Sequence, residues 1–89
     1  MSDARFASTV PWIELRLWRQ FVAVAEELHF GRAATRLHMT QPPLTQAIAK
    51  LERVLGLRLF DRTKRSVQMT TAGAALLPQA RDLLARAQA

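Results

Sequence analysis

Residues 30–56, FGRAATRLHMTQPPLTQAIAKLERVLG, decide the fold, because their pattern predicts two helices joined by a tight turn. The first helix carries a narrow apolar stripe of Ala33, Ala34 and Leu37, and such small residues let another helix approach closely. A short turn at 38–39 follows this stripe. Together these features predict a helix-turn-helix.

The second helix of the pair opens on two prolines. Thr40 can cap this helix by accepting a hydrogen bond from a backbone N–H group two or three residues on. Pro42 and Pro43 are tolerated in the first turn, because the first four N–H groups of a helix have no intrahelical partner. Gly56 can adopt the left-handed conformation that closes many helices. We therefore predict a helix over about 41–55.

The predicted helix 41–55 is amphipathic. Its apolar residues are spaced by four, three and four positions and mark a face that packs on a core: Leu44, Ile48, Leu51 and Leu55. The opposite face carries small, amide and cationic side chains: Pro42, Thr45, Gln46, Ala49, Lys50 and Arg53. Such a face suits contact with base edges and phosphates, although the outer face of an ordinary surface helix is polar too.

Positive charge is concentrated in the same region. The chain of 89 residues has 13 Lys and Arg against 7 Asp and Glu, which gives a net charge of +6. Residues 31–65 hold eight of these cations and two of the acids, whereas residues 1–30 and 66–89 are nearly balanced. A localised basic patch is typical of proteins that bind a polyanion.

A small hairpin is predicted after the helix pair. Leu57 and Leu59, and later Val67 and Met69, alternate with polar residues, which indicates two short strands. We expect four apolar residues to close the core here: Leu57, Phe60, Val67 and Met69. The tip between the strands holds three cations in four residues: Arg62, Thr63, Lys64 and Arg65. This tip suits a phosphate backbone or a minor groove, although basic turns also occur on many protein surfaces.

A first helix precedes the pair. We expect a mobile arm at 1–11, which has no periodicity, and a helix that opens at Trp12 or Ile13. Glu14 then lies in the first helical turn, where the helix dipole favours an anion. The apolar residues of this helix follow helical spacing and form core scaffold: Leu15, Trp18, Phe21, Val22, Ala25 and Leu28.

The last helix is predicted over about 72–88, after a cap at Thr70 or Thr71. Gly73 weakens its first turn, and Pro78 removes one internal hydrogen bond. A long apolar stripe follows three- and four-residue spacing: Leu76, Leu77, Ala80, Leu83, Leu84 and Ala87. This stripe has more apolar surface than one copy of a small domain covers, so we expect it to pair with a second copy.

The run 21–73, FVAVAEELHFGRAATRLHMTQPPLTQAIAKLERVLGLRLFDRTKRSVQMTTAG, resembles the N-terminal domain of LysR-type bacterial transcriptional regulators, and the likeness extends over about 13–87. The resemblance implies a mainly α winged helix-turn-helix at 12–70, with a three-helix core and a two-stranded wing, and a linker and dimerisation helix at 71–89. It implies a homodimer that binds a partly palindromic promoter site. A full-length protein could also form a tetramer. A small-molecule effector would act only through a C-terminal domain outside this chain.

On this interpretation the helix 41–55 lies in the major groove of DNA. We expect four residues to recognise bases: Pro42, Thr45, Gln46 and Ala49. We expect ten residues to hold the DNA backbone or the minor groove: Arg32, Thr40, Gln41, Pro43, Lys50, Arg53, Arg62, Thr63, Lys64 and Arg65. Many relatives carry Ser and Arg in place of Thr45 and Gln46. A Gln amide matches adenine whereas Arg prefers guanine, so this chain should prefer A·T pairs there.

The sequence gives no sign of catalytic chemistry. Without cysteine there is no disulfide, thiol nucleophile or Cys-containing zinc site. His29 and His38 have no carboxylate cluster at metal spacing, and no phosphate loop or activated nucleophile is evident, so we expect no enzyme activity, cofactor or metal. No apolar run is long enough to span a membrane and 1–10 lacks a signal-peptide core, which favours the cytoplasm.

Two other functions fit the same residues. A winged-helix domain could use its basic patch to bind an acidic protein, or it could bind DNA without sequence preference, as nucleoid proteins do. Salt-dependent binding to any duplex would exclude the protein interaction module. A large ratio of specific to nonspecific affinity would exclude the nonspecific binder.

Overall fold

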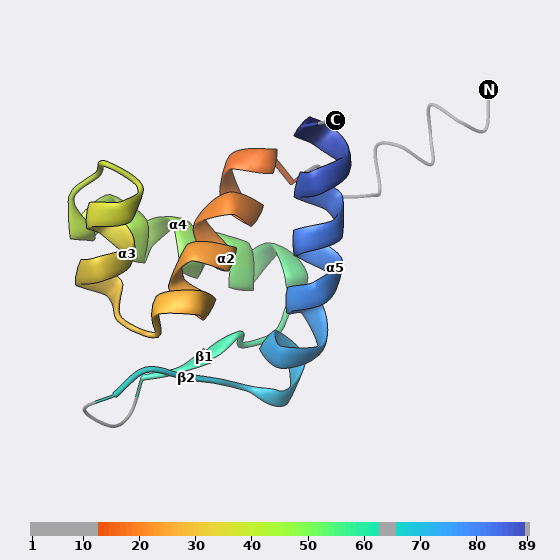
Figure 1. Cartoon of the computed structure of the whole chain (residues 1–89). Coiled ribbons are helices and arrows are strands. Elements are labelled where there is room, and N and C mark those ends of the chain that lie inside the picture. Colours follow the sequence, from red (N-terminus) through yellow and green to blue (C-terminus); the bar gives the residue numbers. More distant parts are fainter. Residues whose placement is uncertain (1–12, 63–65, 89) are drawn as a thin grey trace.

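The computed structural model describes residues 13–62 and 66–88. In chain order they form α2 (Leu15–Glu27), α3 (Phe30–Arg36), α4 (Gln41–Leu55), β1 (Phe60–Asp61), β2 (Gln68–Met69) and α5 (Thr71–Gln88). Figure 1 shows α2, α3 and α4 gathered together, the hairpin β1–β2 at one end and α5 alongside α2. The predicted mainly α winged helix-turn-helix is confirmed.

Two predicted features lie outside the described residues. They are the arm at 1–11 and the wing-tip residues Thr63, Lys64 and Arg65. Within the part of the chain that the structure describes, no helix has the length and apolar character needed to cross a membrane.

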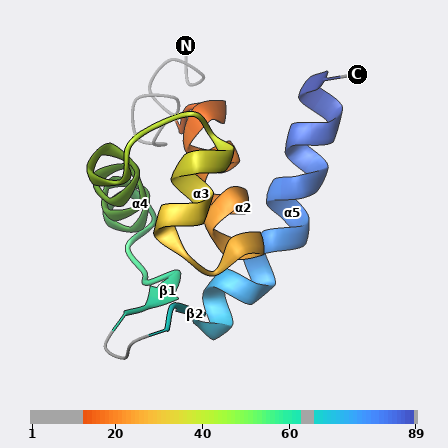
Figure 2. The ribbon, with the colours of Figure 1, turned by 60° about the vertical axis from the view of Figure 1, so that its left-hand side comes forward.

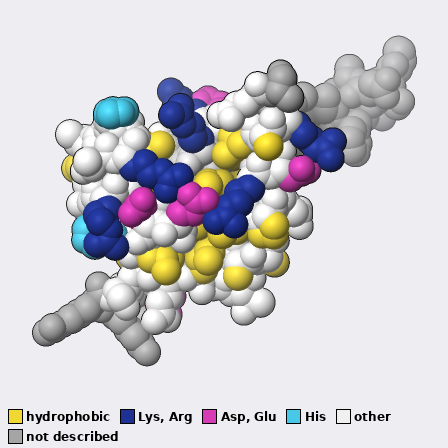
Figure 3. Space-filling view, viewed as in Figure 1, with side chains coloured by type: hydrophobic (Ala, Val, Ile, Leu, Met, Phe, Trp, Pro, Cys, Tyr) yellow, Lys and Arg dark blue, Asp and Glu magenta, His cyan; other side chains and the backbone are white. Residues whose placement is uncertain are grey.

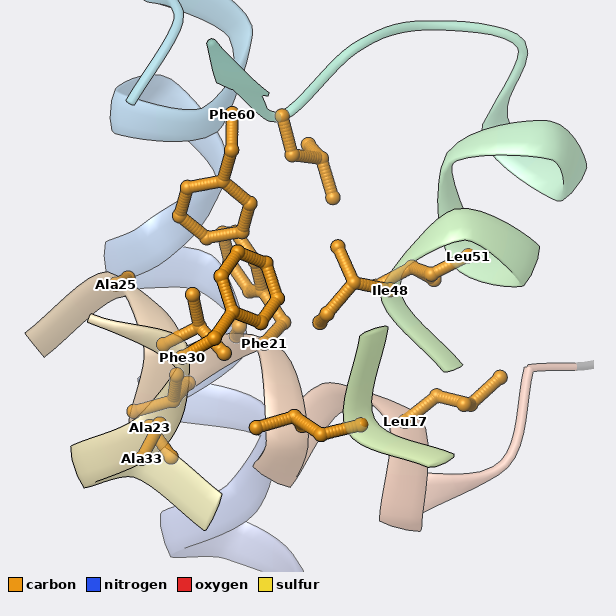
Figure 4. Close-up of a cluster of buried hydrophobic side chains, with 14 of the residues drawn as sticks. Leu17, Phe21, Ala23, Ala25, Phe30, Ala33, Ile48, Leu51 and Phe60 are labelled. Atoms are coloured by element: carbon orange, nitrogen blue, oxygen red, sulfur yellow. The ribbon is translucent and has the colours of Figure 1, made fainter. Parts of the chain in front are cut away.

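The core lies where α2, α4 and the start of the hairpin meet (Figure 4). Its largest fully buried side chains come from all three places: Phe21, Val24, Leu44, Ile48, Leu51, Leu59 and Phe60. The ring centroids of Phe21 and Phe60 are 5.7 Å apart, and those of Phe30 and Phe60 are 6.3 Å apart. Burying one such side chain stabilises the fold by roughly 1.5–3 kcal/mol. The core therefore holds α4 and the wing in a fixed relation.

Helix α2 begins later than predicted, and its predicted core face holds at Phe21, Val22 and Ala25 but fails at the two ends of the helix. Glu14 is its N-cap residue, with extended backbone at φ −66° and ψ 142°, so the prediction that Glu14 lies in the first turn is wrong. Leu15 and Leu28 are 47% and 41% exposed, whereas Leu17 is buried beside Phe21. Each residue turns a helix by about 100°, so Leu15 and Leu17, two positions apart, lie about 200° apart around the axis and cannot share one face.

Helix α4 has the predicted bounds, but the predicted cap at its start is wrong. Thr40 occupies the N-cap position without a side-chain hydrogen bond. A capping hydroxyl accepts from the second or third N–H group of the helix, and these positions are Pro42 and Pro43, which have none. At the other end Gly56 has φ 71° and closes the helix as predicted.

Helix α5 starts with a cap that also ties it to the wing. Thr70 Oγ1 accepts from the backbone N–H of Gly73 at 3.1 Å and donates to the carbonyl of Arg58 at 2.6 Å. A Cβ atom on Gly73 would lie 2.3 Å from the backbone oxygen of Leu59. The sequence marks Gly73 as a weak helix residue, but the structure needs a glycine there because two backbones approach closely.

The wing is a two-stranded antiparallel hairpin around the predicted tip. Its register pairs Phe60 with Met69 and Asp61 with Gln68. Leu59 is fully buried directly before β1, whereas Leu57 is 42% exposed, so the prediction that Leu57 closes the core is wrong. Of the two leucines in the segment after α4, Leu59 therefore supplies the core contact.

Candidate nucleic-acid interface

The face of α4 predicted to contact DNA is open. Figure 2 shows α4 at the edge of the molecule, with α3 and α2 between it and α5. Nearly all the residues predicted on or before this face are exposed: Thr40, Gln41, Pro42, Pro43, Thr45, Gln46, Lys50 and Arg53. Ala49 is half-buried. The structure therefore presents this set together on one side of the molecule.

A groove of about 580 Å³ separates α4 from the start of α2. Gln46, Lys50 and Arg53 line one side of this groove, and Arg16 lines the other. Lys50 and Arg53 form no ion pair with another described residue, whereas Arg16 pairs with Glu14 at 2.6 Å. The two α4 cations are thus available to an external anion.

Arg32, predicted as a backbone contact, is turned toward α2. Its Nη2 donates to the backbone carbonyl of Glu27 at 3.0 Å, and its Nε lies 3.5 Å from the Glu27 carboxylate. The backbone N–H of Arg32 donates to His29 Nδ1 at 3.0 Å, so His29 caps α3. A phosphate contact by Arg32 would have to compete with Glu27.

Arg62, predicted as a phosphate contact of the wing, is half-buried and paired with Glu52. Its Nη2 lies 3.3 Å from Glu52 Oε1, and its guanidinium lies 5.3 Å from the centre of the Phe30 ring. Its Nε is buried and has no hydrogen-bond partner among the described residues. Because a buried carboxylate needs a counter-charge, the Glu52 carboxylate holds the Arg62 guanidinium at the base of the wing. A phosphate contact by Arg62 would therefore have to compete with Glu52, and its role in DNA binding stays a prediction.

Glu52 joins the recognition helix to the wing. Its Oε2 accepts from the backbone N–H groups of Leu59 and Phe60 at 2.8 and 3.2 Å and lies 3.7 Å from Arg58 Nε. The Glu52 side chain is only 8% exposed. No role was predicted for Glu52 from the sequence, and its burial and contacts show that it anchors the wing.

A second acidic residue, Glu26, was also missed. Its carboxylate binds Arg36 of α3 at 2.6 Å and Arg81 of α5 at 2.8 Å. The Arg36 guanidinium, assisted by Arg81, lowers the pKa of Glu26 below its ordinary value of 4.5, while burial works in the opposite direction. Glu26 and Arg81 are 55 positions apart, so no local pattern in the sequence could reveal this pair.

The apolar stripe predicted for dimerisation is divided between two environments. Leu77 and Ala80 are buried within the single chain, at 8% and 2% exposure, so little of either side chain is left for the predicted contact between copies. They face α2 because α5 must cover the core before it can offer a surface to a partner. Leu76 and Leu84 are half-buried, whereas Leu83 and Ala87 are exposed. Trp18, Leu76 and Leu83 help to line a small apolar pocket of about 180 Å³.

No group of three or more His, Cys, Asp or Glu side chains within 13–62 and 66–88 is arranged to hold a metal ion. The interface therefore consists of an open polar helix, a wing anchored by a buried carboxylate and a long helix with a partly exposed apolar side.

Comparison with known proteins places this arrangement among transcriptional regulators. The chain is 60% identical over 72 residues to the uncharacterized HTH-type transcriptional regulator YnfL of Escherichia coli K12, covering 81% of this chain and 24% of that protein. It is 56% identical over 75 residues to the HTH-type transcriptional regulator ShiR of Corynebacterium glutamicum, covering 84% and 25%. The chain thus spans about a quarter of the length of these curated relatives.

Solved structures share the fold. The BenM_DBD/catB site 1 DNA complex superposes with a TM-score of 0.82 at 42% identity, covering 85% of each chain. A CbnR_DBD–DNA complex gives 0.81 at 42% identity, covering 85% of this chain and 87% of that one. Oxidized OxyR of Corynebacterium glutamicum gives 0.84 at 45% identity, covering 88% and 24%. Residues 15–74 match the family model described as bacterial regulatory helix-turn-helix protein, lysR family, and the chain therefore belongs to the LysR family.

Proposed function

We propose that this chain is the sequence-specific DNA-binding domain of a LysR-type transcriptional regulator, acting in the cytoplasm as a homodimer on a partly palindromic promoter site. The observation that carries the proposal is the open outer face of α4, with its amide, hydroxyl and cationic side chains. The similarity to BenM_DBD and CbnR_DBD, whose structures are DNA complexes, supports the same function.

In this proposal α4 enters the major groove. Gln46 and Thr45 are exposed near the N-terminal end of α4 and supply the polar groups for base recognition. Pro42 and Ala49 are small and apolar and let the helix lie close to the base edges. A Gln amide offers the donor and acceptor that match adenine, so A·T is the expected pair at its position. Thr40, Gln41 and Pro43 border the phosphates at the start of the helix.

Four cations per subunit remain for the phosphate backbone once Arg62 is assigned to Glu52: Lys50, Arg53, Lys64 and Arg65. A dimer then makes about eight phosphate contacts, and log K should fall with log salt at a slope of about −7. Thr63 belongs to the same tip. Arg32 joins this set only if phosphate displaces Glu27, which would make the slope steeper.

The dimer is proposed to form through the exposed side of α5. Leu83 is 41% exposed and lies beside Leu76 and Trp18 at the small apolar pocket, with Ala87 one turn further on. Changing Leu83→Asp would bury a charge in that contact and should yield a folded monomer. Sedimentation measures the mass and circular dichroism checks the helicity. A variant that stays dimeric would place the contact elsewhere.

The test of function is selection of bound sequences from a random duplex pool, repeated at two salt concentrations. We expect one enriched, partly symmetric motif and affinity that falls steeply with salt. Absence of binding to any duplex would favour a protein interaction module. Salt-dependent binding without enrichment would favour a nonspecific nucleoid-type protein.

A further inference from the structure

One carboxylate connects three helices of this domain. Glu26, near the end of α2, accepts from Arg36 Nη2 of α3 at 2.6 Å and from Arg81 of α5 through both Nε and Nη2, at 2.9 and 2.8 Å. Glu27 extends the network, because it lies 3.4 Å from Arg36 and 3.5 Å from Arg32. Figure 3 shows basic and acidic side chains alternating across the face where α3, α2 and α5 lie.

The geometry of this network is better than that of an ordinary surface pair. Arg81 presents two donors to one carboxylate oxygen, and Arg36 takes the other oxygen, so both oxygens of Glu26 are engaged. Charge-assisted contacts with several donors fix direction as well as distance. The Arg36 guanidinium is the main cause of the lowered pKa of Glu26, which indicates that the ionised carboxylate is the bound form at neutral pH.

The contact between Arg81 and Glu26 lies in the second half of α5, and its position there affects how this half is held against α2. The first half of α5 is fixed by core packing, through Gly73 against Leu59 and through buried Leu77 and Ala80. Beyond that point a groove of about 340 Å³ opens between α5 and α2, and Arg36 and Arg81 help to line it. Figure 2 shows α5 diverging from α2 toward its C-terminal end. Leu84, further along α5, is half-buried and still packs against the core, so Arg81 fastens the second half of α5 to α2 beside this groove.

We propose that the Glu26–Arg81 contact sets the angle at which α5 leaves the helix-turn-helix and thereby the half-site separation that the dimer prefers. The inference rests on the proposed function, in which α5 joins two copies on DNA. If α5 forms the dimer contact, its angle to α2 determines where the two α4 helices stand relative to each other. Glu26 and Arg81 are positioning residues, since neither is required to contact DNA.

The experiment compares Arg81→Gln with Arg86→Gln in the whole 89-residue chain. Arg86 is a matched control, because it lies on the same helix and, among the described residues, forms an ion pair with Asp82 alone, four residues away on α5 itself, at 2.9 Å. Binding is measured on duplexes recovered by selection, with the half-sites moved apart or together by one or two base pairs, and on a duplex with a single half-site. Each base pair moves a half-site by about 3.4 Å and turns it by about 35°.

The wild type and Arg86→Gln should prefer one separation. Arg81→Gln should bind that duplex about two- to fivefold more weakly, the range expected for losing surface ion pairs, and should discriminate less between separations. Its affinity for the single half-site should stay within about twofold of wild type. Glu26→Gln should show the same reduced discrimination between half-site separations. Adding Arg81→Gln to Glu26→Gln should not change the affinities further.

Several results would overturn the inference. An unchanged separation profile in Arg81→Gln means that core packing alone sets the angle. An equal loss on the single half-site, with a shallower salt dependence, means that Arg81 contacts phosphate. Failure of the proposed function is distinguishable from both, because the wild type itself would then bind no duplex or ignore separation. Circular dichroism of each variant confirms that the fold is intact.

Discussion

The outer face of α4 and the base of the wing both carry cations, yet the charges of the two regions serve different purposes. Lys50 and Arg53 on the outer face are exposed and form no ion pair with another described residue. Arg62, at the base of the wing, is bound to the buried Glu52. The comparison shows that the positive charge of a segment does not tell which of its cations are free to bind DNA, because some of them are paired with acids of the same chain. Inner charges should control stability, and outer residues should control affinity.

The largest expected effect is at Glu52. Glu52→Gln removes the partner of Arg62 and weakens the acceptor for two backbone N–H groups, so we expect the free energy of unfolding to fall by about 2–4 kcal/mol. Urea unfolding at pH 7 measures the change. Asp82→Asn, which loses only the exposed pair with Arg86, is the control and should cost under about 1 kcal/mol. Equal losses of unfolding free energy in the two variants would contradict the proposal that inner charges control stability more than exposed ones do.

Gly73→Ala tests the close approach behind the wing. Helix propensity alone predicts a gain of about 1 kcal/mol, but the new Cβ would meet the backbone oxygen of Leu59, so we expect a loss of about 1–3 kcal/mol. Thermal and urea unfolding show directly whether the substitution raises or lowers the free energy of unfolding. Ala75→Gly, at an exposed position of the same helix, should lose about 1 kcal/mol through propensity alone. A stabilised Gly73→Ala protein would show that the wing can move away from α5 at little cost.

On the outer face, Gln46→Ala should leave the free energy of unfolding within about 0.5 kcal/mol of wild type, because the side chain is exposed. Its affinity for the best selected duplex should fall by about 1–3 kcal/mol, with one base position relaxed in each half-site. Fluorescence anisotropy on selected and random duplexes measures both. Gln88→Ala, at an exposed position near the end of α5, is the control. A loss of equal size on random DNA would contradict base recognition by Gln46.

The smallest effect concerns pH and Glu26. Because Arg36 and Arg81 lower its pKa in the folded state, ionised Glu26 stabilises the fold above its ordinary pKa of 4.5, and this contribution is lost as pH falls through the lower folded value. We expect wild type to exceed Glu26→Gln by less than about 1 kcal/mol at pH 7, and the difference to vanish in acid. Unfolding curves of both proteins at several pH values test this. A difference that persists below the folded pKa would have another origin.

Local pattern was enough to predict the order and kind of the elements. The bounds of α4 follow from the spacing of Leu44, Ile48 and Leu51 and from the left-handed conformation that Gly56 allows. The hairpin follows from the change of period after that glycine. These signals are local, because the angle around a helix and the alternation along a strand depend only on separation in the chain.

The tertiary structure alone decided which side of each helix faces the core and which charges are engaged. Spacing relates residues of one helix to each other, but the packing of α2 selected Leu17 over Leu15, and the packing of α5 buried Leu77 and Ala80. Arg62 is engaged because folding places it beside the buried Glu52, and Arg81 reaches Glu26 because folding brings α5 against α2. Such contacts depend on distances between segments remote in sequence, which the sequence on its own does not display.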